Sequence, residues 1–300
     1  MSLFLPLSSA IAYVIGALLI KRASDLGADV WRTTRITNYI SAAAAMLLFP
    51  LGGTIPSSNL WWHPPFAALL FFVGQIFTLL ALNTGDVSVA TPVLGVKILL
   101  VAVLSALLIG EPIGARLWTA AALSSVAIAL LNISPGHRHR RVGTTILLAA
   151  LGATAYALFD VLVQKWSPPW GTGRFIPIVM TCAAVFSVPL RRFEASDNVS
   201  AARNVRRPGP PDPAHTRWLA AGATCFAVQG LMFVSTVSIY RQVTSANVLY
   251  SSRGLWSVVA VWAIGHWFAN REQQLGARVL VWRFIGAILL MAAILMVIFG

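Results

Sequence analysis

The stretch "GQIFTLLALNTGDVSVATPVLGVK", residues 74–97, has a counterpart in "GLMFVSTVSIYRQVTSANVLYSSR", residues 230–253. At one constant offset the two stretches match Gly74 with Gly230, Phe77 with Phe233, Val87 with Val243, Ala90 with Ala246 and Lys97 with Arg253. A second match joins "AIAYVIGALLIKR" (10–22) to "ATAYALFDVLVQK" (153–165) at a smaller offset, which a longer loop in the second half would explain. These matches indicate an internal repeat, with one copy in each half of the chain.

The composition is that of a membrane protein. Hydrophobic residues make up 58% of the 300 residues and charged residues only 10%, whereas a soluble domain has about 25% charged residues. A spanning helix needs about 20 mostly apolar residues. The sequence predicts ten such runs, at 3–20, 33–51, 64–83, 87–109, 115–133, 143–163, 174–190, 217–239, 243–267 and 279–299. Because the runs are continuous and do not alternate, they exclude a transmembrane β-barrel and predict an all-α membrane protein.

The repeat divides the predicted helices into two groups of five. We expect a first five-helix repeat over 1–136, a basic linker over 137–142 and a second five-helix repeat over 143–300. Two tandem units with an odd number of spans enter the membrane in opposite directions, and such inverted repeats are typical of secondary transporters. In those folds the substrate site lies near the bilayer midplane, between the repeats.

The stretch 85–131 has a recognisable pattern. A Gly-x-Val-Ser-x-Ala-x-Pro segment precedes an apolar run that ends in Gly-Glu, and a helix rich in small residues follows. The pattern residues are Gly85, Val87, Ser88, Ala90, Pro92, Gly110 and Glu111. With Lys21 and Arg35, they make the chain resemble the drug/metabolite transporter superfamily, EamA type, which implies a ten-helix transporter. The second half departs from the pattern, because Val248 replaces the proline and no acid follows Gly265–His266.

Two basic residues lie deep inside predicted spans. Lys97 and Arg253 are each about the eleventh residue of their runs, about 15 Å deep, at the midplane. A charge there costs roughly 2.5–3.5 kcal/mol on insertion scales, and intramembrane charges are usually functional. The clear intramembrane acid is Asp160, so one cation is left to water, to backbone carbonyls or to an anion. Arginine effectively cannot deprotonate, and its guanidinium fork binds a carboxylate or phosphate bidentately.

Other polar side chains fall at similar depths. The candidate substrate-binding residues are Lys97, Arg253, Asn247, Tyr250, Trp256, Gln75, Gln229, Tyr13 and Tyr156, and Asp160 is the candidate counter-charge or proton carrier. The resemblance adds that related nucleotide-sugar and triose-phosphate transporters use basic residues of the fourth and ninth helices for anionic substrates. The alternative is a structural role, with Lys97 or Arg253 paired within the protein and the polar residues bonding neighbouring helices.

Several other functions are excluded or disfavoured. The chain has no Walker-type phosphate loop, so ATP is not expected to drive it, and we expect no enzymatic activity, cofactor or metal. The net charge of +13 is attributed to lipid headgroups and topology rather than to nucleic acid. Basic residues gather in the odd-numbered connections, which predicts that both termini lie outside the cytoplasm, whereas the resemblance implies that both lie inside.

The sequence therefore predicts a secondary active transporter that moves a small, anionic metabolite by alternating access. Its partners would be the substrate, membrane lipids and a coupling proton or counter-substrate, and its location the bacterial inner membrane. Two alternatives stay open. One is an exporter of amino acids or drug-like cations, and the other is a non-transporting membrane protein that binds lipid or acts as a scaffold.

Overall fold

A computed structural model describes residues 3–84, 87–110, 112–131, 142–194, 213–264 and 277–299. Within these ranges the chain is helical and contains no strand, which confirms the all-α class. Seven helices are long and apolar enough to cross a membrane: Phe4–Asp25, Ser58–Leu82, Val89–Leu108, Val142–Trp166, Thr172–Glu194, His215–Tyr240 and Val281–Ile298. Ala115–Leu131 is a shorter apolar helix. The predicted count of ten spans and the inverted arrangement of two repeats therefore stay predictions.

The helices follow the predicted runs closely. In chain order they are α1 (Phe4–Asp25), α2 (Val30–Ala45), α3 (His63–Thr84), α4 (Val87–Gly95), α5 (Lys97–Leu108), α6 (Ala115–Leu131), α7 (Val142–Trp166), α8 (Thr172–Phe186), α10 (Pro213–Tyr240), α11 (Val243–Tyr250), α12 (Arg253–Ile264) and α13 (Ala277–Ile298). Short 3-10 helices are η1 (Met46–Leu51), η2 (Ser58–Leu60) and η3 (Val188–Leu190). Most of the predicted linker, 137–141, lies outside the described residues.

Four predicted runs are interrupted, and one of them is 174–190, in which α8 is followed by η3. The run 33–51 becomes α2 followed by η1, which contains Pro50 and ends at Gly52 with a φ of 72°. The runs 87–109 and 243–267 each form two helices, α4 with α5 and α11 with α12. The second helix of each pair begins at a half-buried cation, Lys97 in α5 and Arg253 in α12. The starts of α5 and α12 coincide under the offset that relates Lys97 to Arg253.

Tight turns cause both breaks. At the first, the Val96 amide bonds the carbonyl of Val93, three residues back, which overwinds the helix. At the second, the amides of Ser251 and Ser252 bond carbonyls three residues back. The Ser251 hydroxyl also donates to the Val248 carbonyl, and such side-chain bonds compete with regular helical pairing.

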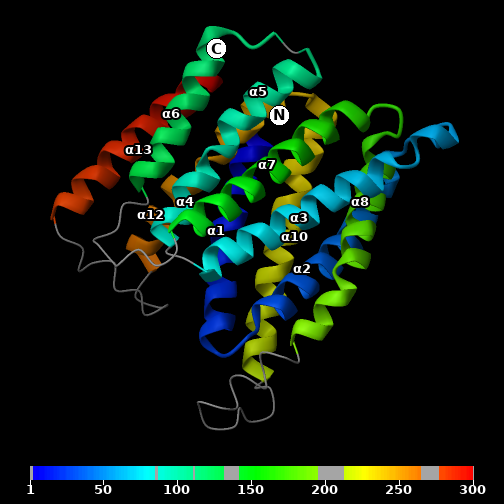
Figure 1. The fold of residues 1–300 in the computed structure, drawn as a ribbon, viewed down its shortest axis with the longest axis horizontal. Coiled ribbons are helices and arrows are strands. Elements are labelled where there is room, and N and C mark those ends of the chain that lie inside the picture. The colour runs from blue at the N-terminus through cyan, green and yellow to red at the C-terminus, as the bar shows by residue number, and fades with distance from the viewer. Residues whose placement is uncertain are drawn as a thin grey trace.

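The described helices form one bundle in which the predicted halves are interleaved. The closest pairs are α1 with α10, α3 with α7 and α6 with α13, and each joins a helix of the first half to one of the second (Figure 1). The contact between α3 and α7 is so close that a Cβ atom added at Gly74 would lie only 3.0 Å from the Tyr156 ring. Figure 1 also places both chain ends at the same end of the bundle, which we call the N/C end.

Candidate functional site

A cavity of about 660 Å³ lies between the interleaved helices. Residues from α1, α2, α3, α4, α5, α6, α7, α8, α10, α11, α12 and α13 line it. Its charged lining residues are Lys97, Asp160, Arg253 and Arg283. Three cations and one carboxylate therefore face one space in the middle of the bundle.

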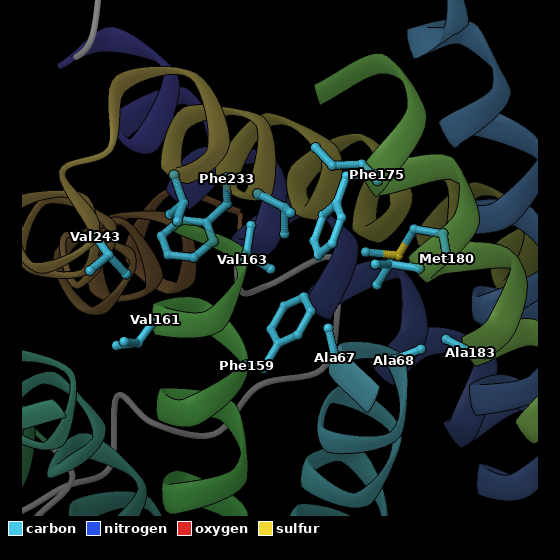
Figure 2. Close-up of a cluster of buried hydrophobic side chains, with 14 of the residues drawn as sticks. Ala67, Ala68, Phe159, Val161, Val163, Phe175, Met180, Ala183, Phe233 and Val243 are labelled. Atoms are coloured by element: carbon cyan, nitrogen blue, oxygen red, sulfur yellow. The ribbon is translucent and has the colours of Figure 1, made fainter. Parts of the chain in front are cut away.

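The cavity reaches toward the end of the bundle opposite the N/C end. Its lining includes Leu82 and Leu131, which lie at or near the ends of α3 and α6. On the N/C side, a core of buried apolar side chains fills the space instead, and Figure 2 shows Phe159, Phe175 and Phe233 within it. This core blocks the cavity on the N/C side. The cavity therefore lies between the core and the opposite end of the bundle.

Lys97 is neutralised within the protein. Its Nζ atom lies 2.7 Å from Oδ2 of Asp160, whose side chain is only 3% exposed. The same carboxylate oxygen accepts a hydrogen bond of 3.0 Å from Nδ2 of Asn247. The Lys97 ammonium also lies over the rings of Tyr156 and Phe233, at 5.6 and 5.5 Å. The structure thus joins four predicted site residues, and this ion pair is the one that the structural alternative allowed.

Arg253 has different surroundings. Its guanidinium lies over the rings of Tyr13 and Tyr250, at 4.7 and 4.8 Å, and Nη1 donates to the Tyr250 hydroxyl at 3.3 Å. No acidic side chain in the described part of the chain lies within ion-pair distance of it. The backbone amides of Ser251, Ser252 and residues 254 and 256 are already bonded to carbonyls. An anion beside Arg253 would therefore be held by side chains and not by amides at the helix break.

The remaining predicted residues divide into two groups. Gln75, Gln229 and Tyr156 line the cavity, and Gln75 exchanges two hydrogen bonds with Asn38, at 2.9 and 3.0 Å. Trp256, however, is 40% exposed and does not line the cavity. Ser257, one turn after Arg253, lines the cavity in its place.

Arg283 and Asn38 are among the lining residues that the sequence analysis missed. Arg283 lies in the first two turns of α13, where a cation resembles an ordinary helix-end charge. Asn38 is 2% exposed in α2 and also bonds the hydroxyl of Ser187 at 2.6 Å. The sequence did contain a signal for Arg283, because it is an arginine inside a predicted apolar run. No feature of the sequence indicated that Asn38 would be buried.

Replacing Asn247 by alanine is expected to destabilise the protein by about 1.5–3 kcal/mol, the usual range for a hydrogen bond to a charged group. Chemical unfolding of the purified protein in detergent would measure this cost. In an Asp160→Ala background the cost should fall, because the two residues share one interaction. An equal cost in both backgrounds would show that Asn247 does not act through the Asp160 carboxylate.

Comparisons with known proteins agree with this architecture. Residues 1–133 match the profile of the EamA-like transporter family. This first part of the chain is therefore similar to the EamA-like transporter family, which belongs to the drug/metabolite transporter superfamily. The EamA match lies in the first half, which carries Lys97 and Tyr13. A crystal structure titled only as that of a protein is 18% identical, has a TM-score of 0.66 and covers 96% of both chains, which supports the fold alone. No curated protein matches the chain.

Proposed function

We propose that this EamA-like protein is a secondary active transporter that carries a small metabolite by its anionic group. The observation that carries the proposal is Arg253, a cavity-lining guanidinium with no acidic partner among the described residues. Arginine stays protonated in proteins, and an unpaired charge inside a membrane protein is costly. A bound carboxylate or phosphate would remove that cost through paired, charge-assisted hydrogen bonds.

The charge balance of the lining supports an anion over a cation. Of the four charged lining residues, Lys97 and Asp160 neutralise each other. Arg253, which has no acidic partner among the described residues, adds a positive charge to the lining. A focused positive potential in a cleft with apolar walls raises the local concentration of anions.

Alternating access between the two halves is the mechanism we favour. The cavity is blocked on the N/C side by the buried core around Phe159 and Phe233, and broken helices at a midplane site are typical of transporters that rock around it. Lys97 and Arg253 each start the second part of such a broken helix. Asp160 would act as the counter-charge of Lys97 and, when a proton is coupled, as its carrier. We place this activity in the bacterial inner membrane.

One observation favours a second candidate, an exporter of amino acids or drug-like cations. The Asp160 carboxylate faces an ammonium that also lies over the Tyr156 and Phe233 rings. Aromatic faces with a carboxylate suit cationic ligands as well, so a substrate ammonium would compete with Lys97 for this position. This candidate predicts that Asp160→Asn abolishes transport, whereas neutralising Lys97 does not.

Replacing Arg253 by glutamine is expected to abolish the thermal stabilisation that anionic metabolites give. The reason is that no other described side chain offers a guanidinium for bidentate hydrogen bonding at that position. Arg253→Lys should keep part of it, since the charge remains and only the bidentate geometry is lost. The measurement is a thermal-shift screen of the purified protein against anionic and cationic metabolites. Equal stabilisation of the wild-type protein and Arg253→Gln by an anion would refute the anion site. No stabilisation by any solute would favour the lipid-binding or scaffold alternative.

A further inference from the structure

The two half-buried cations share one feature of their surroundings, a tyrosine ring at equivalent positions of the repeat, and differ in the residue one turn after that tyrosine. In the aligned segments 10–22 and 153–165, Tyr13 corresponds to Tyr156 and Ala17 to Asp160. Lys97 lies over the Tyr156 ring and Arg253 over the Tyr13 ring. One turn after its tyrosine, α7 presents the carboxylate that neutralises Lys97. One turn after the corresponding tyrosine, α1 has an alanine.

We propose that a carboxylate of the transported molecule takes, beside Arg253 and Ala17, the position that the Asp160 side chain takes beside Lys97. This proposal rests on the proposed function and narrows its substrate class to carboxylates. The second donor to Asp160 is Asn247. The residue at the corresponding position in the first half is Thr91, which, unlike Asn247, lines the cavity. A ligand carboxylate would therefore have Arg253, and on closure Thr91, around it.

The directions of the helices put the Ala17 position on the accessible side. α1 runs antiparallel to α10, because the Ser9 hydroxyl bonds the Gln229 carbonyl while Gly16 approaches Gly222. α7, in contrast, ends beside the start of α11, where Gln164 accepts a bond of 2.7 Å from the Val243 amide. In α7, the residue one turn after the tyrosine therefore lies nearer the closed N/C side than the tyrosine does. In α1 the corresponding residue lies nearer the open side of the cavity.

The chemistry around Arg253 fits a carboxylate on an apolar body. In the other half a single planar carboxylate is sufficient to neutralise the cation, with one neutral amide as the second donor. Tyr13 and Tyr250 line the cavity beside the guanidinium, and Phe226 lines it next to Tyr13. Such aromatic walls suit an apolar or aromatic group attached to the anion.

The test supplies the missing carboxylate from the protein. Ala17→Asp should neutralise Arg253 internally and compete with the ligand, whereas Ala17→Asn introduces the same volume without the charge. The probe is benzoate, with benzamide as its neutral analogue and phenyl phosphate as its phosphate analogue, and the readout is the affinity from concentration-dependent thermal shifts. We expect Ala17→Asp to bind benzoate at least about tenfold more weakly than Ala17→Asn, because a charge-assisted bond contributes about 1.5–3 kcal/mol.

Each result has a defined meaning. Equal benzoate affinities of Ala17→Asp and Ala17→Asn would overturn the proposed position, while a loss in Arg253→Gln would keep the proposed function. Stabilisation of the wild-type protein by phenyl phosphate but not by benzoate would overturn the carboxylate class and keep an anionic substrate. If neither anion stabilises the wild-type protein and Arg253→Gln changes nothing, both proposals fail.

A second variant covers the case in which Ala17→Asp does not insert into the membrane. Ala17→Cys, in a protein whose Cys182 and Cys225 are alanine, can be alkylated after purification. Iodoacetate adds a carboxylate and iodoacetamide the matching amide, each forming a carbon–sulfur bond as iodide leaves. We expect the carboxymethylated protein to lose benzoate affinity by about tenfold relative to the amide form, and equal affinities would overturn the proposal.

Discussion

Replacing Asp160 by alanine is expected to destabilise the protein by about 3–5 kcal/mol, because removing one partner of a buried ion pair leaves the other charge uncompensated. The carboxylate is 3% exposed and lies 2.7 Å from the Lys97 ammonium. The rings of Tyr156 and Phe233 would offset only part of the loss, since a cation over an aromatic ring gains about 0.5–2 kcal/mol. Thermal and chemical unfolding of the purified protein in detergent would measure the difference.

The matched control removes both charges. A Lys97→Met/Asp160→Leu double variant should regain most of the stability, because buried ion pairs can often be replaced by apolar residues of similar volume without a net cost. A cost below about 1 kcal/mol for Asp160→Ala alone would contradict the prediction, since that is the range of an exposed ion pair. A double variant as unstable as the single one would show that packing, and not charge, causes the loss.

The fold class and the central residues were predictable because they depend on hydrophobicity and depth alone. Uninterrupted apolar runs specify helices in a membrane, and a lysine and an arginine at their centres need partners wherever the helices lie. The sequence supplied one intramembrane acid, Asp160, as a candidate partner of either cation, and in the structure its carboxylate lies 2.7 Å from the Lys97 ammonium. No second acid was available for the other cation, and Arg253 has no acidic partner among the described residues.

The helix breaks were not predictable from hydrophobicity. The segment around Val96 is as apolar as the helices on either side of it, so the hydropathy pattern continues across the turn. Two features accompany the break at Val96. Pro92 lies one turn earlier in α4, and the Ser125 hydroxyl donates a hydrogen bond of 3.2 Å to the Gly95 carbonyl. The hydrogen bond from Ser125 joins α6 to α4 and exists only once the bundle has formed.

The sequence also could not predict which face of each helix points into the bundle. A helix that is apolar all round carries little information about which residues point inward. Trp256 was therefore predicted to line the cavity, whereas it is 40% exposed. Asn38, which is buried and bonded to Gln75 and Ser187, lies in a run that also contains several other polar residues. Only the packing of α2 against α8 distinguishes it from them.

Replacing Gly173 by alanine is expected to separate the two halves at the N/C end. A Cβ atom at this position would lie 2.6 Å from the carbonyl oxygens of both Leu48 and Gly52, which belong to the first half. Gly173 is the second residue of α8, in the second half. Backbone oxygens cannot rotate away as a side chain can, so the segment around η1 must move. Overpacking of this kind typically costs about 1–3 kcal/mol, and it acts on the closed side of the cavity.

The expected result is therefore a change in access as well as in stability. Ala246 is 2% exposed within the core that blocks the cavity on the N/C side. In a protein without its native cysteines, Ala246→Cys should react faster with a membrane-impermeant maleimide when Gly173→Ala is also present. Gly143 is the matched control, because it too is the second residue of its helix and has nothing within 4 Å of an added Cβ. Equal labelling rates in the Gly173→Ala and Gly143→Ala proteins would show that the contact between Gly52 and Gly173 does not hold the N/C side closed.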